Sequence, residues 1–347
     1  MGGKPNRKES YGFINLIAVV ACFAVIVIIL SVMFAKFIID RSSELSGQDE
    51  SSDAEISRTP EESGDESFAP SAPEASRETS EPELSAEVSE EEPYRIIMLE
   101  EEDIHKGTLV VVNSETPFDF SHAPVTVNIY KTRTQKTFSF SDTNLLISQN
   151  VMTPLQEMLN ALSAYVGNSS LTLTSAYRSE EAQKKLYDAG KDSDAPGESD
   201  LHTGLSFKCT VYPSSSGKLG EGKFQWLDEN CMFYGFIQRY PEGKKSLTGH
   251  DAVRSLFRYV GVPHAYLIYV NNYCLEEYVD FCRRFSYESK YVTTCDGIDY
   301  AIYYVPVNRQ GVTQIKIPEN TEYTVSGDNS GGFIVTLTLG SSASSGE

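Results

Sequence analysis

The sequence predicts an α+β protein whose folded part follows a long N-terminal region that cannot build a core. Three observations support this prediction: an apolar run at Leu16–Ala35, an acidic stretch at 40–93, and mixed helical and strand patterns beyond Pro93. One segment with helical periodicity lies among several β-branched runs, and the last segments alternate as strands. This order of patterns is typical of a mixed domain followed by a small β module.

The apolar run Leu16–Ala35 is interrupted by a single serine. About 20 such residues cross a bilayer as a helix. Three basic residues precede the run and acidic residues follow it, so the positive-inside rule places the N-terminus in the cytoplasm. We therefore expect a cytoplasmic tail at 1–12, one transmembrane helix at 13–39, and a cell-membrane protein whose main domain is extracytoplasmic. A cleaved signal peptide is the alternative, although its apolar region spans only about 7–15 residues.

The acidic stretch at 40–93 is rich in Ser, Glu, Pro, Ala and Asp. It holds 18 acidic and three basic residues, a net charge of −15 out of −20 for the whole chain. Such a composition cannot bury enough apolar surface to offset the entropy of ordering the chain, so a disordered stalk is predicted. The acidity therefore belongs to a tether, and the lack of a basic patch argues against a nucleic-acid partner.

The folded part is predicted to divide into a domain at 94–290, a C-terminal β module at 291–341 and a disordered tail at 342–347. Apolar periodicity predicts helices where a stripe of large side chains recurs every three to four residues. The expected helices are 151–166, a segment from Ser179 to about Gly190, 224–234, 262–271 and 275–284. The expected strands are 107–113, 125–130, 171–177, 236–240, 257–260, 300–306, 313–317 and 332–339.

Cysteines beyond the apolar run are odd in number, and no CxxC pair occurs. We interpret them mainly as small core residues, with one disulfide left open. They are Cys209, Cys231, Cys274, Cys282 and Cys295.

Several segments, in the right order, resemble the VanY-type D-alanyl-D-alanine carboxypeptidases of bacterial cell-wall metabolism. They are Ser175–Ser179, Ala195–Ser199 with Thr203–Leu205, Trp226–Leu227 with Tyr234–Pro241, Thr248–Gly249, Arg258–Gly261 and Leu275–Tyr278. The resemblance covers about 175 residues in the middle of the chain. It implies a VanY/hedgehog-like D,D-peptidase fold, with a small antiparallel sheet and flanking helices. It also implies one zinc ion held by two histidines and an aspartate, a glutamate base, and an arginine that steadies the substrate.

The residues aligned with this zinc site cannot provide its chemistry. The first histidine falls on Leu201, the aspartate on Lys208, the base on Val253 and the second histidine on Leu256. Leucine and valine have no lone pair for a metal, and lysine is protonated at pH 7 because its reference pKa is about 10.4. The sequence therefore predicts no catalytic residues and no bound zinc, although zinc is the cofactor expected for the family.

The arginine of the family pattern is retained as Arg178, so we expect an inactive relative that binds a peptidoglycan stem peptide or an envelope protein. Arg178 would hold a terminal carboxylate, Tyr177 and Ser199 would line the pocket, and Lys208 would add positive charge. One alternative is an active D,D-carboxypeptidase with a relocated metal site at His202, Cys209 and His250. A second alternative is a structural or scaffolding envelope protein whose β module makes the contacts.

Overall fold

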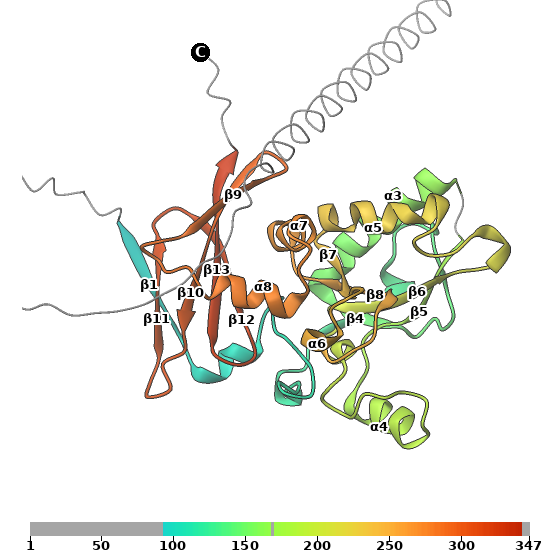
Figure 1. Cartoon of the computed structure of the whole chain (residues 1–347), viewed down its shortest axis with the longest axis horizontal. Helices are drawn as coiled ribbons and strands as arrows, with labels where there is room; N and C mark the ends of the chain where they lie inside the picture. The colour runs from blue at the N-terminus through green and yellow to red at the C-terminus, as the bar shows by residue number, and fades with distance from the viewer. Residues whose placement is uncertain (1–92, 168–169, 342–347) are drawn as a thin grey trace, which may run out of the picture. The chain divides into compact units, whose positions relative to one another are not determined.

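The computed structural model describes residues 93–167 and 170–341 (Figure 1). These residues belong to one compact unit, 86–347. The predicted tail at 1–12, transmembrane helix at 13–39 and C-terminal tail at 342–347 lie outside the described residues, as does nearly all of the stalk at 40–93. Within 93–167 and 170–341, no helix is long and apolar enough to cross a bilayer.

A five-stranded sheet, in the order β3-β5-β6-β8-β7, forms the centre of the peptidase-like part. The pairing is antiparallel except between β3 and β5, which run parallel. The bounds are β3 Ser139–Phe140, β5 Leu171–Ser175, β6 Ser206–Val211, β7 Phe236–Tyr240 and β8 Val253–Tyr259. A two-stranded ribbon of β2 (Thr126–Asn128) and β4 (Leu146–Ser148) lies apart from this sheet.

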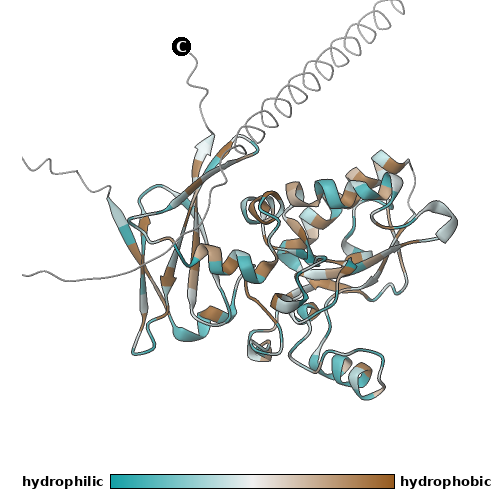
Figure 2. Cartoon of the chain, viewed as in Figure 1, coloured by the Kyte–Doolittle hydropathy of each residue, from teal (hydrophilic) through white to brown (hydrophobic). Residues whose placement is uncertain are grey.

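Helix α3 (Met152–Val166) contributes the largest apolar stripe to the core of this sheet. It ends at Gly167, which has a positive φ of 81°, a backbone conformation that glycine adopts without steric cost. Helix α4 (Glu180–Asp188) is capped by Ser179 and is mostly exposed and hydrophilic (Figure 2). The remaining helices are α2 (Ile129–Thr132), α5 (Trp226–Asn230), α6 (Lys245–Thr248), α7 (Val262–Val270) and α8 (Leu275–Cys282).

A second sheet, in the order β12-β13-β10-β9, lies beside a ribbon formed by β1 and β11. The bounds are β1 Tyr94–Leu99, β9 Tyr291–Cys295, β10 Ile298–Pro306, β11 Thr313–Pro318, β12 Glu322–Gly327 and β13 Gly332–Ser341. The predicted boundary between the domain at 94–290 and the β module at 291–341 stays a prediction. Strand β1, from the first of these segments, pairs with β11 from the second. Ile302 and Ile334 also share a core cluster with α7 and α8.

The segment Gly107–Asn113 is not the strand that its β-branched run predicts. Its residues 109–112 are buried, and arginine side chains, rather than a neighbouring strand, bond several of its carbonyls. Arg258 Nη2 donates to the carbonyls of Thr108 and Val110 at 3.0 and 2.9 Å, and Arg239 Nη2 donates to that of Val112 at 3.4 Å. The β-branched pattern therefore predicted the burial of this segment correctly, but not its hydrogen-bond partners. Side chains distant in the sequence take the place of a neighbouring strand and bond its backbone carbonyls.

All five cysteines in the described residues are buried free thiols. They lie within the apolar core clusters or beside them, as the interpretation as core residues expects.

Candidate functional site

The four positions aligned with metal ligands and base lie where the short 3-10 helix Asp200–Thr203 meets β6 and β8. Leu201 and Leu256 are only 1% and 3% exposed, and they form a small apolar cluster with Tyr240 against which Val253 packs. Lys208 lies directly opposite Leu256 in the β6–β8 pairing. The fold therefore brings three of the four positions into one cluster and places the fourth beside them. We call these four residues the degenerate site.

The degenerate site does not fit a zinc ion. Zinc takes nitrogen, oxygen or sulfur donors in tetrahedral geometry, whereas the site offers hydrocarbon side chains and one lysine. In the part of the chain that the structure describes, no three His, Cys, Asp or Glu side chains are arranged to hold a metal ion. The chemistry of the side chains, and not an empty space, is the reason for this misfit.

Arg178 lies next to the degenerate site, because its backbone N–H donates to the carbonyl of Leu201 at 3.2 Å. Its guanidinium is already engaged: Nη1 donates to Asp192 and Gln183, each at 2.6 Å, and Nη2 donates to Ser175 at 3.3 Å. An arginine has five N–H donors, so two remain for a ligand. Asp192 already pairs with the positive charge of Arg178, so Arg178 would attract a ligand carboxylate less strongly than an unpaired arginine would.

Two carboxylates, Asp192 and Asp194, face the cations of this region. Burial alone would raise the pKa of Asp192, but the hydrogen bond from Arg178 and the nearby charge of Lys208 hold it below its usual value. Burial also raises the pKa of Asp194, and there it prevails over the attraction of His250 and Lys208. Asp194 is therefore the less well compensated carboxylate, with His250 Nδ1 3.7 Å from its Oδ1.

Tyr240 connects the apolar cluster to these polar groups. Its ring stacks on His250, with centroids 4.1 Å apart and planes inclined by 17°. Its hydroxyl is the one buried side-chain polar atom in the described residues without a hydrogen-bond partner. Burial raises the pKa of this hydroxyl well above its usual value, so it stays protonated.

The relocated metal site at His202, Cys209 and His250 is not formed. His202 is buried, with Nδ1 2.7 Å from the carbonyl oxygen of Arg178, while its Nε2 accepts the N–H of Gly197 at 3.2 Å. Cys209 is in the core beneath the sheet, where burial raises the pKa of its thiol well above the usual range. Adjacent residues of a strand face opposite sides, so Cys209 points away from the face of β6 that carries its neighbour Lys208.

The other two residues predicted to line the pocket, Tyr177 and Ser199, differ in how much of their surface is exposed. Tyr177 is partly buried beside Arg178, and its N–H donates to the carbonyl of Leu146 at 2.8 Å. Ser199 is only 3% exposed, and its carbonyl accepts the N–H of His202. Ser199 therefore supports the turn into the degenerate site and presents little surface to a ligand.

A buried ionic network stands beside the degenerate site. Asp200 Oδ1 accepts from Arg239 Nε at 2.8 Å and from Arg258 Nη1 at 2.7 Å, and all three side chains are fully buried. Arg239 also pairs with Glu276 at 2.7 Å. Although burial opposes it, the two arginines hold the pKa of Asp200 below its usual value. We call Asp200, Arg239, Arg258 and Glu276 the ionic network.

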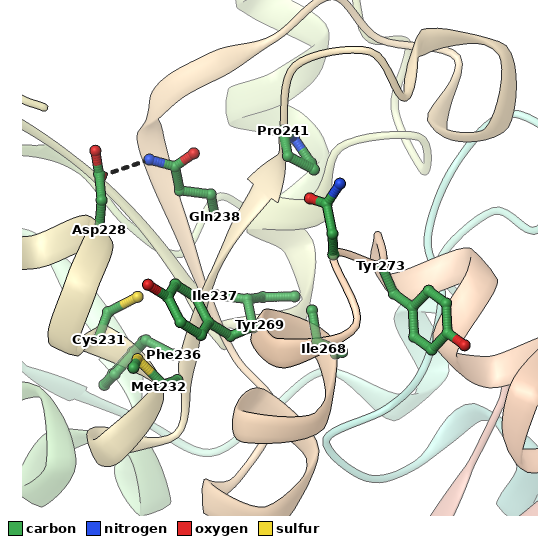
Figure 3. A pocket seen from close by; sticks show the side chains of 11 residues that line it. Asp228, Cys231, Met232, Phe236, Ile237, Gln238, Pro241, Ile268, Tyr269 and Tyr273 are labelled. Atoms are coloured by element: carbon green, nitrogen blue, oxygen red, sulfur yellow. Dashed lines mark hydrogen bonds between the residues drawn. The ribbon is translucent and has the colours of Figure 1, made fainter. Parts of the chain in front are cut away.

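A separate hollow of about 220 Å³ lies along β7 (Figure 3). Its wall is mainly apolar, with Met232, Ile237 and Ile268 among the lining side chains. Two of its polar residues bond each other, since Gln238 Nε2 donates to Asp228 at 2.6 Å. It shares no residue with the degenerate site.

Sequence reasoning missed Asp192, Asp194 and Tyr240 as members of this region. Tyr240 lies inside the quoted motif segment Tyr234–Pro241, where it was used only as a marker of the fold. The two aspartates precede the motif Ala195–Ser199 and carry no pattern of their own, so only the fold reveals that they face Arg178 and Lys208.

Comparison with known proteins agrees with this architecture. The family model described as VanY, D-alanyl-D-alanine carboxypeptidase, matches residues 144–262. A D-alanyl-D-alanine carboxypeptidase of Enterococcus faecium is 34% identical over 245 residues, which are 70% of this chain and 78% of that protein. The bifunctional D-Ala-D-Ala dipeptidase and carboxypeptidase VanXYC of Enterococcus gallinarum is 27% identical over 158 residues, 41% of this chain and 82% of that protein.

Among solved structures, the vancomycin-resistance D,D-dipeptidase VanXYg, in complex with a D-Ala-D-Ala phosphinate analog, superposes with a TM-score of 0.61 and 29% identity. The match covers 71% of this chain and 99% of that one.

Proposed function

The chain belongs to the VanY family of D-alanyl-D-alanine carboxypeptidases, and from this premise we propose that it is a non-catalytic member that binds peptidoglycan stem peptides. The observation that carries the proposal is the burial of Leu201 and Leu256, which stand at aligned ligand positions, in one apolar cluster with Tyr240. Hydrolysis of a peptide bond by this family's chemistry needs a metal-activated water and a base. Hydrocarbon side chains supply neither.

Binding a peptide requires neither a metal ion nor a base, and cationic groups suited to a peptide carboxylate are present at and beside the degenerate site. Arg178 keeps two N–H donors, and Lys208 lies partly exposed across the strand pair from Ser175 and Leu256. The relative VanXYg was crystallised with an analog of D-Ala-D-Ala. These facts support a stem peptide ending in a D-alanyl carboxylate as the ligand.

The proposal also includes the cellular location and membrane topology of the protein. The apolar segment at 13–39 anchors the chain in the cell membrane, and the acidic stalk at 40–93 holds the domain outside it, where stem peptides occur. Protease added to intact protoplasts is expected to degrade the domain while sparing the tail at 1–12. Protection of the domain in intact protoplasts, with degradation only after lysis, would contradict this topology.

Catalytic inactivity is tested on the purified full-length chain by its zinc content and by release of D-alanine from a pentapeptide stem. Neither stoichiometric zinc nor chelator-sensitive D-alanine release is expected. Finding both would replace the proposal with an active enzyme that uses an atypical metal site.

Binding is tested by calorimetry with the same pentapeptide. Arg178→Ala is expected to weaken binding roughly 10- to 100-fold, the effect of losing about 1.5–3 kcal/mol from a charged hydrogen bond. Arg254→Ala is the matched control, because that side chain is 44% exposed and pairs with Asp228 away from the degenerate site. Thermal melting checks that both variants fold. If the unmodified chain takes up no peptide, a scaffolding role replaces peptide binding.

A further inference from the structure

A hollow of about 400 Å³ lies between the β12-β13-β10-β9 sheet and the start of α7, away from the degenerate site. We call it the hydroxyl pocket. Its volume is within the range of small-molecule sites, about 300–1,000 Å³. Residues of the C-terminal strands and of the peptidase-like part both line it: Gly107, Thr108, Asn150, Tyr259–His264, Tyr300, Thr324–Ser326, Ile334, Thr336 and Thr338.

Strand register gathers hydroxyl groups on the pocket face of the sheet. Thr324 lies directly opposite Thr336 in the β12–β13 pairing, and Thr338 lies opposite Tyr300 in the β13–β10 pairing. Directly paired residues have Cβ atoms about 4.5–5.5 Å apart on the same face. The opposite face of the same strands carries apolar residues such as Val335, which pack into a separate core cluster. The alternation of the strands thus separates a core face from a hydroxyl-bearing face.

Some of these hydroxyls are held in place and others are open. Thr336 Oγ1 is 3.0 Å from His264 Nε2, and His264 Nδ1 is 2.7 Å from the Tyr278 hydroxyl. The hydroxyls of Thr324, Thr338 and Tyr300 have no hydrogen-bond partner among residues 93–167 and 170–341, and all three residues are partly or fully exposed. The pocket therefore combines one fixed polar anchor with three unsatisfied donor–acceptor groups.

The lining contains no Asp, Glu, Lys or Arg, although such residues make up 22% of the chain. Burial lowers the pKa of His264 to about 3, so this histidine is also neutral at pH 7. A charged ligand would meet no counter-charge here and would lose its hydration. A neutral ligand with many hydroxyl groups would meet matching donors and acceptors.

We propose that the hydroxyl pocket binds an uncharged saccharide, through the hydroxyl ladder of Thr324, Thr336, Thr338 and Tyr300. This inference uses none of the residues proposed to bind stem peptides. An N-acetylated amino sugar chain and a plain hexose chain share the required chemistry, so both are tested.

The experiment is calorimetry on the full-length chain with N-acetylglucosamine trimer and with cellotriose. We expect millimolar or tighter binding of at least one, and the stronger of the two identifies the sugar class. The variant with Thr324→Val and Thr338→Val keeps the β-branched shape and removes two hydroxyls, and roughly tenfold weaker binding is expected. Thr174→Val on β5 is the matched control, because Thr174 is an exposed strand threonine remote from the pocket lining.

Tyr300→Phe, which removes one oxygen only, is a second test and is expected to weaken binding about threefold. No binding of either sugar, or undiminished binding by both the double variant and Tyr300→Phe, would overturn the proposal. Stem-peptide binding measured on the same samples separates the two sites. The valine double variant should keep it, and Arg178→Ala should keep saccharide binding.

Discussion

The degenerate site and the ionic network are neighbours built from the same strands, yet their chemistry is opposite. Leu201 follows Asp200 in the chain, and Leu256 and Arg258 both lie on β8. At the degenerate site, three of the four side chains are hydrocarbon and pack on one another. In the ionic network, three fully buried charged side chains bond together, Asp200 with both Arg239 and Arg258, and the two arginines also bond the backbone of 108–112. The comparison shows that these neighbouring segments contain two kinds of position. Charged residues of the ionic network stabilise the fold, whereas the degenerate site occupies the positions at which the family's metal ligands and base align.

Removing Asp200 is expected to have the largest effect on stability. Asp200→Ala leaves Arg239 facing only Glu276 and leaves Arg258 without a carboxylate partner, both at 0% side-chain exposure. Breaking a buried ion pair in this way costs about 3–5 kcal/mol. Denaturant unfolding measures the loss, with Asp251→Ala as control: that carboxylate is 84% exposed, and its pair with Lys245 is worth at most about 1 kcal/mol. Equal effects of the two variants would mean that the ionic network does not hold the frame.

Rebuilding the ligands tests the other half of the comparison. The combined variant Leu201→His, Lys208→Asp, Val253→Glu and Leu256→His is expected to bind zinc, because the frame already gathers these positions. Zinc at 100 times its Kd would raise the free energy of unfolding by about 2.7 kcal/mol. The same variant without Leu256→His is the control, since it lacks one ligand. If zinc stabilises both equally, the four positions do not form one site.

Truncating the apolar cluster is expected to cost somewhat less. Leu256→Ala removes a side chain that is 3% exposed, and loss of a buried leucine typically destabilises by about 2 kcal/mol or more. Leu247→Ala, at a leucine 47% exposed, should change stability by no more than about 0.5 kcal/mol. Thermal unfolding of both proteins distinguishes a packed cluster from loosely placed side chains, which would give similar small losses.

The smallest expected effect is a gain, at Asp194. Its pKa is raised in the fold mainly by burial, so the folded state is penalised when the carboxylate ionises. Asp194→Asn should therefore stabilise the protein at pH 7, by up to about 1.4 kcal/mol for each unit by which the pKa is raised.

The advantage of Asp194→Asn should fade as the pH falls through the raised pKa, where the unmodified carboxyl takes up its proton. Asp192→Asn should do the reverse, since Arg178 and Lys208 hold the pKa of Asp192 low, and its contribution is lost only as the pH falls below the usual carboxyl range. Melting temperatures measured from pH 7 down to about pH 2 test both variants, because the Asp192 contribution is lost only below the ordinary carboxyl pKa. A stabilising Asp192→Asn variant at pH 7 would contradict this assignment.

Much of the fold follows from local sequence. The predicted helices at 151–166, 262–271 and 275–284 match α3, α7 and α8 to within two residues at each end. Their apolar spacing is a property of neighbouring residues, and burial of that face is what stabilises them. Family membership likewise follows from motifs that are contiguous in the chain.

Local sequence failed where a distant group replaced a local partner. The run Gly107–Asn113 has the composition of a strand, but Arg239 and Arg258 take its carbonyls. Asp192 is bonded to the Arg178 guanidinium, although nothing in the local sequence places these two side chains together. The spacing of these residues in the sequence does not predict either set of contacts.

The sequence alone determined that Leu201, Val253 and Leu256 cannot ligate a metal, because the absence of a donor atom is a covalent property of each residue. It also determined the alternating and helical patterns from which the elements form. Only the tertiary structure decided which polar groups satisfy one another, and which, such as the hydroxyls of Tyr240, Thr324 and Thr338, do not. The physical reason is that hydrogen bonds and charges act over a few ångströms in space, between residues that the chain separates by tens of positions.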